Sequence, residues 1–246
     1  MSAQKSDLHI HTVYSGHSAP DMTVKNIINK AEELDLDEIA ITEHSFDWHL
    51  GPKGNFDLIR SEVDAINSDL TIHVGMEIDP DSNNIGKLVF EDFDKKKLYP
   101  LLVGTHGFPG IARGWHEKFQ MTSLEKKFVY STWFTMMEKI IARGIIDILA
   151  HPGRLIMQNE IIKEFDSTVL KDFERLFSIM KENHTAFEIN ESLFRRFPTE
   201  RLRESYKNLI RLAISSNLKI TYGSDAHSLE KIGNFQLTKE LDMSNT

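Results

Sequence analysis

The chain has 246 residues, of which 40% are hydrophobic and 27% are charged, and its formal net charge is −8. This composition is ordinary for a soluble globular protein, and the length suits one α/β barrel better than two domains. The acidic balance argues against a broad nucleic-acid-binding surface, although it leaves room for a small anionic substrate. The absence of cysteine excludes disulfides and thiolate metal sites.

The ends and the hydropathy of the chain bear on its location and organisation. No window approaches the roughly 18 to 20 apolar residues of a membrane-spanning helix. The first residues, MSAQKSDLHIH, lack the apolar core of a signal peptide and lead almost at once into an expected strand. No linker-like segment or internal repeat interrupts the chain. We therefore expect a single domain over residues 1–246 in a cytoplasmic protein with no membrane partner.

Short β-branched runs alternate along the chain with longer segments of helical periodicity. The expected strands, in chain order, cover residues 7–11, 38–44, 70–79, 101–106, 147–151, 186–190 and 219–225. The expected helices cover residues 23–34, 56–67, 122–142, 167–183 and 198–216, with Thr23 and Ser167 as N-caps. This alternation predicts a parallel sheet that closes, or nearly closes, into a barrel. The active site of such a barrel lies at the carboxyl ends of its strands.

Two segments interrupt the alternation. Residues 80–100 predict a turn and a short extra strand, and the DFDKKK stretch within them predicts a solvated face. Residues 107–121 predict a long loop after the fourth strand, and long ordered loops often serve as lids or binding loops. Arg113 and Trp115 in this loop are candidates for substrate contact. A surface loop with one buried tryptophan is an equal alternative.

Potential metal ligands occur at nearly every expected strand end. They are His9, His11, His17, His44, Glu77, His106, His151, Asp225 and His227. His9 and His11 are two residues apart on a strand, so both should point to the same side. Asp225 and His227 have the same spacing, and they meet the first pair if the barrel closes. One such histidine alone would be read as structural, whereas nine ligands at one rim predict a site for several ions of Zn, Mn or Fe.

The motifs DLHIHT, ITEH, GME, GTH, AHPG and GSDAH resemble those of the PHP (polymerase and histidinol phosphatase) family of metal-dependent phosphoesterases, in its stand-alone trinuclear branch. The resemblance spans Asp7 to His227 and implies a distorted seven-stranded (β/α)7 TIM-like barrel with three divalent ions. It implies one ion on His9, His11, Glu77 and Asp225, a second on Glu77, His106 and His151, and a third on His17, His44 and His227. Three ions against the two carboxylates predict a cationic pocket that suits phosphate.

These ligands predict hydrolysis of a phosphomonoester of a small metabolite by a hydroxide that bridges two of the three ions. Glu77 and Asp225 are the expected catalytic carboxylates. Arg154, in the HPGR sequence, is the best candidate for a phosphate clamp, because guanidinium binds phosphate oxygens in pairs.

Several further residues near the strand ends are candidates for supporting roles. Arg195 and Arg196 follow the sixth strand, and Asn190 ends it, so all three are candidates for substrate contact. Asp7 is a candidate for orienting His9, and Glu43 stands next to His44.

Other functions stay open from the sequence. Within the family, these are a histidinol-phosphate phosphatase, a nucleotide phosphatase and a phosphodiesterase. The histidinol phosphatase branch often has His-x-Asp after the fifth strand, where this chain reads HPGR. A metal amidohydrolase also begins with His-x-His but lacks counterparts of His17, His44 and His227. A non-catalytic metal-stabilised module is the remaining alternative, and the complete ligand set argues against it.

Overall fold

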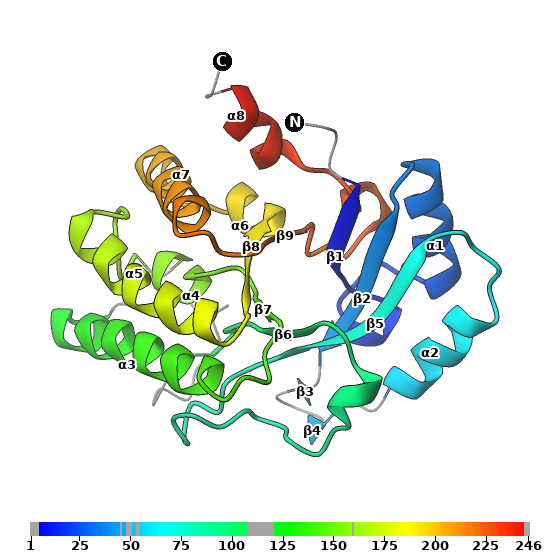
Figure 1. Ribbon diagram of the computed structural model, residues 1–246, viewed down its shortest axis with the longest axis horizontal. Helices are drawn as coiled ribbons and strands as arrows, with labels where there is room; N and C mark the ends of the chain where they lie inside the picture. Colours follow the sequence, from blue (N-terminus) through cyan, green and yellow to red (C-terminus); the bar gives the residue numbers. More distant parts are fainter. Residues whose placement is uncertain are drawn as a thin grey trace.

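A computed structural model of the chain describes residues 5–44, 46–47, 51–52, 55–107, 121–158 and 160–243. Its centre is a parallel sheet of seven strands in the order β1-β2-β5-β6-β7-β8-β9 (Figure 1). The strands are β1 (Ser6–Ile10), β2 (Glu38–His44), β5 (Thr71–Ile78), β6 (Leu101–Val103), β7 (Ile148–Leu149), β8 (Ala186–Asn190) and β9 (Ile220–Gly223). The two edges meet where Ile10 bridges Ala226 and the Asp225 N–H donates to the His9 carbonyl at 2.9 Å. The predicted seven-stranded TIM-like barrel is therefore confirmed in a nearly closed form.

The five predicted helices surround this sheet (Figure 1). They are α1 (Val24–Glu33), α2 (Phe56–Asp64), α3 (Ser123–Ile141), α5 (Ser167–Glu182) and α7 (Glu200–Ser215). Thr23 caps α1 as predicted, because its side chain accepts the Asn26 N–H. The predicted Ser167 cap is wrong. Asp166 caps α5 by accepting two amide hydrogens, at 2.9 and 3.0 Å, so Ser167 is the first helical residue. None of the described helices has the length and apolar character needed to cross a bilayer.

Several short elements lie outside the predicted alternation. They are α4 (Arg154–Gln158), α6 (Glu191–Arg195), α8 (Gln236–Met243), the 3-10 helices η1 (Val13–Ser15), η2 (Lys95–Lys97) and η3 (Leu229–Lys231), and the antiparallel pair β3 (Phe46–Asp47) and β4 (Gly51–Pro52). The short extra strand predicted within residues 80–100 is wrong. That segment forms one isolated bridge, Pro80 to Leu88, and the η2 turn, which Asp94 caps. Arg113 and Trp115 lie outside the described residues.

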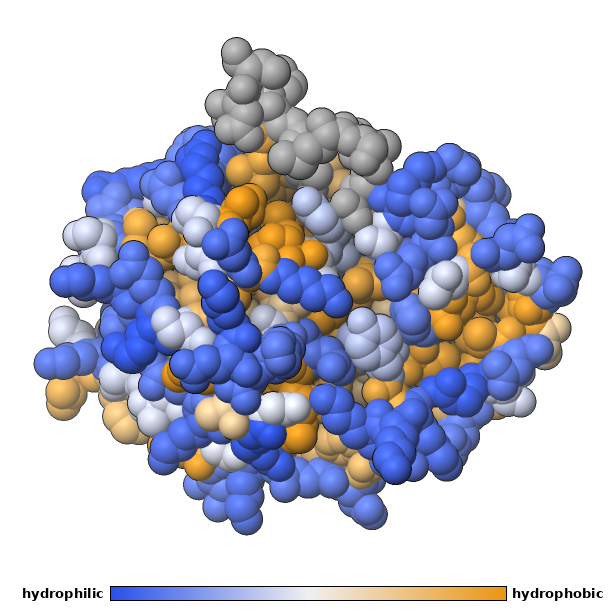
Figure 2. All heavy atoms as spheres, in the orientation of Figure 1, coloured by the Kyte–Doolittle hydropathy of each residue, from blue (hydrophilic) through white to orange (hydrophobic). Residues whose placement is uncertain are grey.

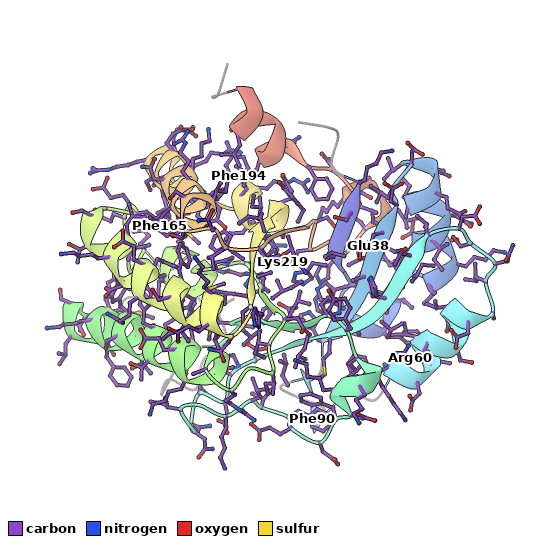
Figure 3. All side chains as sticks on the ribbon, viewed as in Figure 1. Glu38, Arg60, Phe90, Phe165, Phe194 and Lys219 are labelled. Carbon is purple, nitrogen blue, oxygen red and sulfur yellow. The ribbon has the colours of Figure 1, made fainter. Side chains whose placement is uncertain are left out.

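Alternation along the strands separates the core into an outer and an inner part. Outward-facing side chains of the strands pack against the helices in two clusters. The larger cluster also contains Phe165 and Phe194 from the surrounding segments, both labelled in Figure 3. Inward-facing side chains form a small aliphatic layer of Leu8, Ala40, Leu102, Ile148, Ala150 and Ala186. Two residues further along β8, the inward position carries the buried carboxylate Glu188. An apolar base thus supports a polar layer at the carboxyl ends of the strands, and polar residues cover much of the outer surface in the view of Figure 2.

Candidate metal centre

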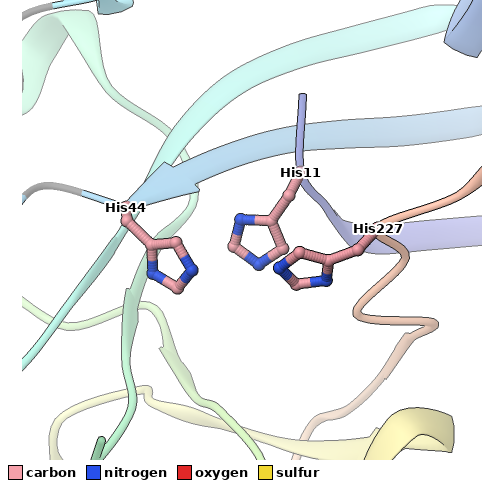
Figure 4. A group of neighbouring side chains, drawn as sticks. All are labelled: His11, His44 and His227. Atoms are coloured by element: carbon pink, nitrogen blue, oxygen red, sulfur yellow. The ribbon is translucent and has the colours of Figure 1, made fainter. Parts of the chain in front are cut away.

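The nine predicted ligands come together at the carboxyl ends of the strands. Contacts between polar atoms of at most 3.5 Å connect all nine of them. Three sets have donor atoms close enough to share an ion: His9 with His11 and Asp225, His11 with His44 and His227, and His44 with Glu77 and His106. Figure 4 shows the second set, in which rings from β2, the end of β1 and the segment after β9 face one another. The closure of the sheet brings the end of β1 and the segment after β9 together.

Glu77 lies at the middle of the cluster, and its two oxygens face different ligands. Oε2 lies 3.1 Å from His44 Nδ1 and 3.4 Å from the Nε2 atoms of both His9 and His11. Oε1 lies 2.7 Å from His151 Nε2 and 3.5 Å from His106 Nε2. The carboxylate therefore separates two groups of imidazoles, which is the geometry of a bridging ligand.

Five of the seven histidines among the predicted ligands have a hydrogen-bond acceptor within 3.4 Å of Nδ1. Carboxylates take this place for His9 (Glu188, 2.7 Å), His11 (Glu43, 3.4 Å) and His106 (Asp79, 3.1 Å), and main-chain carbonyls do so for His17 (Ser15, 3.2 Å) and His227 (Asp225, 3.1 Å). An acceptor at Nδ1 fixes the hydrogen there and leaves the Nε2 lone pair for a metal. The Nε2 atoms indeed face inward, toward the other ligands.

The inward-facing nitrogens provide a test of whether this donor set fits metal ions. His9 Nε2 and His11 Nε2 are 3.0 Å apart, and His17 Nε2 and His227 Nε2 are 2.8 Å apart. Two lone pairs at that distance repel unless a proton or a cation lies between them. Glu77 Oε2 is also buried and has no hydrogen-bond partner among the described residues. Imidazole nitrogens and carboxylate oxygens in this arrangement fit divalent transition-metal ions.

The electrostatics of the buried ligands follow from the same arrangement. Burial alone would lower the pKa of His11, but the Asp225 and Glu43 carboxylates outweigh it and raise the pKa to about 9. Burial opposes ionisation of Glu77, yet His106, His9 and His44 hold its pKa well below the ordinary value. Without a cation, the ionised carboxylates thus keep protons on some of the imidazoles, and a bound metal would displace these protons.

The two more exposed histidines behave in the opposite way. Burial, together with the charge of His44 and His11, lowers the pKa of His17 to about 4. Burial and His11 lower the pKa of His227 to about 3. Both rings are neutral near pH 7 and are ready to donate a lone pair.

Local backbone features make room for the ligands. His151 and Asp225 adopt positive φ angles of 29° and 51°, which turn the chain sharply at two ligands. A Cβ atom on Gly104 would lie 2.5 Å from Glu77 Oε1 and 2.6 Å from His151 Cε1. Glycine in the GTH motif is therefore needed because the chain at the end of β6 passes directly beside the Glu77 carboxylate.

The sequence profile of the PHP domain family matches residues 7–192 of the chain. The chain belongs to the PHP domain family. Among solved structures, it is similar to a putative histidinol phosphatase from Listeria monocytogenes, with a TM-score of 0.70, 20% identity, and coverage of 95% of this chain and 99% of that one. It is also similar to a histidinol phosphate phosphatase from Lactococcus lactis, solved with zinc, L-histidinol and phosphate, with a TM-score of 0.68, 16% identity, and coverage of 98% and 92%. At these identities the likeness establishes a common fold. No curated protein sequence matches the chain.

In this PHP domain the carboxylates that support the ligands differ from those expected. Asp7 makes no hydrogen bond to the His9 ring among the described residues; it accepts the N–H groups of Ser224 and Gly233, each at 2.9 Å, and the His9 backbone N–H at 3.5 Å. The reason is an irregularity in β1, which pairs Asp7 with Ile39 but Ile10 with Ile41 and so contains one extra residue. The parity that placed Asp7 beneath His9 is broken there, and Asp7 ties β1 to the segments that follow β9.

Glu43 supports His11 rather than the ring of its neighbour His44. Its Oε1 lies 3.4 Å from His11 Nδ1 and accepts the His44 backbone N–H at 3.0 Å. Sequence reasoning missed two further carboxylates, Glu188 behind His9 and Asp79 behind His106. The signal was available, since Asp79 lies two residues beyond Glu77 and Glu188 lies two residues before Asn190 on predicted strands. Glu43, Asp79 and Glu188 thus add three carboxyl groups beside the predicted ligands, which the count of ligands alone leaves out.

The predicted substrate contacts fall in different environments. Arg154, at the start of α4, is buried, and its Nη1 lies 3.4 Å from His106 Nε2 and 3.7 Å from Asp225 Oδ2. Arg196 interacts electrostatically with the same two residues, Arg154 and Asp225. Burial and the charge of Arg154 lower the pKa of Arg196, and Asp225 only partly offsets them. Arg195 instead donates to the Asn234 carbonyl at 2.6 Å. Asn190 is completely buried, caps α6 by accepting the Leu193 N–H at 2.7 Å, and donates to Glu188.

Proposed function

We propose that this PHP domain is a metal-dependent phosphatase that hydrolyses a phosphomonoester of a small metabolite at a site of three divalent ions. The observation that carries the proposal is the arrangement around Glu77, whose two oxygens each face a separate group of imidazole nitrogens. His17 and His227 extend this arrangement outward with a further pair of converging lone pairs. Divalent ions bound to such a set would supply hydroxide near neutral pH and offset charge on phosphoryl oxygens.

The side chains of the protein contribute binding, orientation and charge. Glu77 and Asp225 would carry the negative charge that balances bound ions, and Glu43 and Asp79 would hold the His11 and His106 rings in fixed orientations. Arg154 adds a permanent cation beside His106 and Asp225. A guanidinium there suits two phosphoryl oxygens at once and gains strength from its burial, because water competes little for it.

The first substrate to test follows from the similar structures. Both are named as histidinol phosphatases, and one was solved with L-histidinol and phosphate. We propose histidinol phosphate as the leading substrate within the broader class of small phosphomonoesters. In the HPGR sequence after β7, Gly153 stands at the position of the acidic residue often found in that branch, which argues for including other phosphorylated metabolites in the same assay.

The test is release of inorganic phosphate by protein loaded with zinc or manganese. The panel would contain histidinol phosphate, other phosphomonoesters, a phosphodiester, an amide and a lactone. We expect turnover of a phosphomonoester and loss of turnover after chelation. Full metal content with hydrolysis of the amide or lactone alone would show an amidohydrolase, and full metal content with no hydrolysis would show a metal-stabilised module.

Two adjacent arginines provide a matched pair for substrate binding. Arg196→Ala should raise KM several-fold, because it removes a positive charge that interacts with Arg154 and Asp225. Arg195→Ala is its control, since that side chain is turned toward the Asn234 carbonyl. Steady-state kinetics on the best phosphomonoester compare the two. Equal effects of both substitutions on KM would show that Arg196 has no specific role in substrate binding.

A further inference from the structure

Glu188, in the middle of β8, is a buried carboxylate that no metal-ligand motif includes. Its side chain is only 2% exposed. Oε1 accepts from His9 Nδ1 at 2.7 Å, and Oε2 accepts from the His151 backbone N–H at 2.6 Å and from Asn190 Nδ2 at 3.0 Å. One carboxylate thus contacts two predicted ligands, which come from β1 and from the end of β7.

The surroundings of Glu188 are built around this contact. A Cβ atom on Gly223 would lie 2.0 Å from Glu188 Oε1 and 2.7 Å from the Cβ atom of His9, so β9 carries no side chain at that point. His151 is in the left-handed region with φ of 29°, and its N–H is the group that Oε2 accepts. A turn of this kind is costly for a residue with a side chain and needs support from its neighbours.

We propose that Glu188 is a positioning residue that fixes His9 with its hydrogen on Nδ1 and holds the His151 turn, so that both rings present Nε2 to the metal centre. The inference rests on the proposed metal binding. It goes beyond the nine ligands, because it assigns the orientation of ligands on two sides of Glu77 to one side chain. His9 Nε2 lies 3.4 Å from Glu77 Oε2, and His151 Nε2 lies 2.7 Å from Glu77 Oε1.

A glutamine at position 188 can reproduce only one of the two acceptor oxygens of Glu188, because its other terminal group is a donor NH2. If the glutamine oxygen occupies the Oε2 position, it keeps the His151 N–H and the Asn190 amide, and its NH2 group faces His9 Nδ1. His9 must then move its hydrogen to Nε2, which removes the lone pair from the metal. If the glutamine is reversed, its NH2 group meets two donors. The first orientation satisfies more hydrogen bonds, so Glu188→Gln should act mainly through His9.

The experiment measures zinc affinity by competition with a chelator. Because a partner of a metal-ligating histidine typically contributes a factor of about 10 to 100 in metal affinity, we expect Glu188→Gln to weaken the most affected ion by that factor. Glu188→Ala should weaken binding further, because the His151 turn also loses its acceptor. Glu191→Gln is the matched control. Glu191 is another buried carboxylate at this end of the barrel, and it accepts the Leu237 N–H at 2.8 Å, so the control should retain wild-type affinity.

A double-mutant cycle with His9→Ala separates positioning from a general structural role. If Glu188 acts through His9, Glu188→Gln should have little further effect on zinc affinity in the His9→Ala background. Additive effects in the cycle would overturn the inference.

A spectroscopic readout on the wild-type protein needs no variant of Glu188. Nitrogen NMR of the zinc-loaded protein should show His9 with its hydrogen on Nδ1, with the resonance assigned from its loss in His9→Ala. A hydrogen on Nε2 of His9 would overturn the inference even if Glu188→Gln fails to fold. Wild-type protein that binds neither zinc, manganese nor iron would instead contradict the proposed function. Tight zinc binding by both wild type and Glu188→Gln would contradict this inference alone.

Discussion

The candidate metal centre contains an inner and an outer group of predicted ligands, which differ in burial and in the groups that hydrogen-bond to them. The inner group is His9, His11, Glu77, His151 and Asp225, with side chains at most 5% exposed. The outer group is His17, His44 and His227, and the last two have side chains 14% and 19% exposed. The ninth predicted ligand, His106, is intermediate, with a side chain 11% exposed. Carboxylates back His9 and His11, whereas main-chain carbonyls back His17 and His227. Buried, charge-supported ligands are the better preorganised, so the inner group should hold metal more tightly.

The largest expected effect on activity comes from removing Glu77, which contacts several of the predicted ligands. Glu77→Ala takes away both oxygens that face the imidazoles and leaves several buried histidines without a counter-charge. Phosphate release should fall below detection. Zinc at about 100 times its Kd stabilises a protein by about 2.7 kcal/mol, and the variant should lose most of that stabilisation. Thermal unfolding with and without zinc measures it, and full turnover by metal-free Glu77→Ala would contradict the scheme.

A smaller effect is expected on zinc retention, which should differ between variants of the inner and the outer group. His9→Ala removes an inner ligand and should reduce both the zinc content and the turnover strongly. His227→Ala removes an outer ligand, so the inner ions should stay bound while one ion becomes readily exchangeable. Elemental analysis after dialysis against a weak chelator compares the two variants. Equal loss of zinc from both would show that the inner and outer groups do not differ in strength.

The smallest effect concerns protons. In the metal-free protein the pKa of His11 is about 9, so its ring is protonated at pH 7 and must lose a proton when metal binds. The affinity of the inner group should therefore rise with pH up to about 9 and weaken as the pH falls. His17 and His227 have pKa values of about 4 and about 3, so binding to them should depend little on pH above about 5. Calorimetry in buffers of different ionisation enthalpy counts the released protons, and equal release from both groups would contradict the distinction.

How far the sequence predicts this molecule depends on whether a position follows strand alternation. That the nine predicted ligands lie close together was predictable, because most of them stand at or just after the end of a strand, where parallel strands of a barrel bring their residues together. The role of Asp7 was not predictable. One extra residue in β1 reverses which side of the strand Asp7 faces relative to His9, and it leaves no mark in the sequence. The short helix α6 was also missed, so the sequence alone could not distinguish Arg195 from Arg196.

Contacts between distant segments account for the remaining differences. Glu188 meets His9 across 179 residues of sequence, and neither residue type identifies its partner without the fold. The positive φ angles of His151 and Asp225 are likewise not marked in the sequence, since neither residue is a glycine. The N-cap of α5 is a local case, in which adjacent Asp166 and Ser167 both suit the position and only Asp166 occupies it.

The central claim is that the cluster around Glu77 binds several metal ions and not a single one. Anomalous X-ray diffraction at the zinc edge, from crystals of the zinc-loaded protein, tests it most directly. We expect three anomalous peaks at the carboxyl ends of the strands, two of them on opposite sides of Glu77 and the third near His17 and His227. A single peak, or none in contact with Glu77, would contradict it.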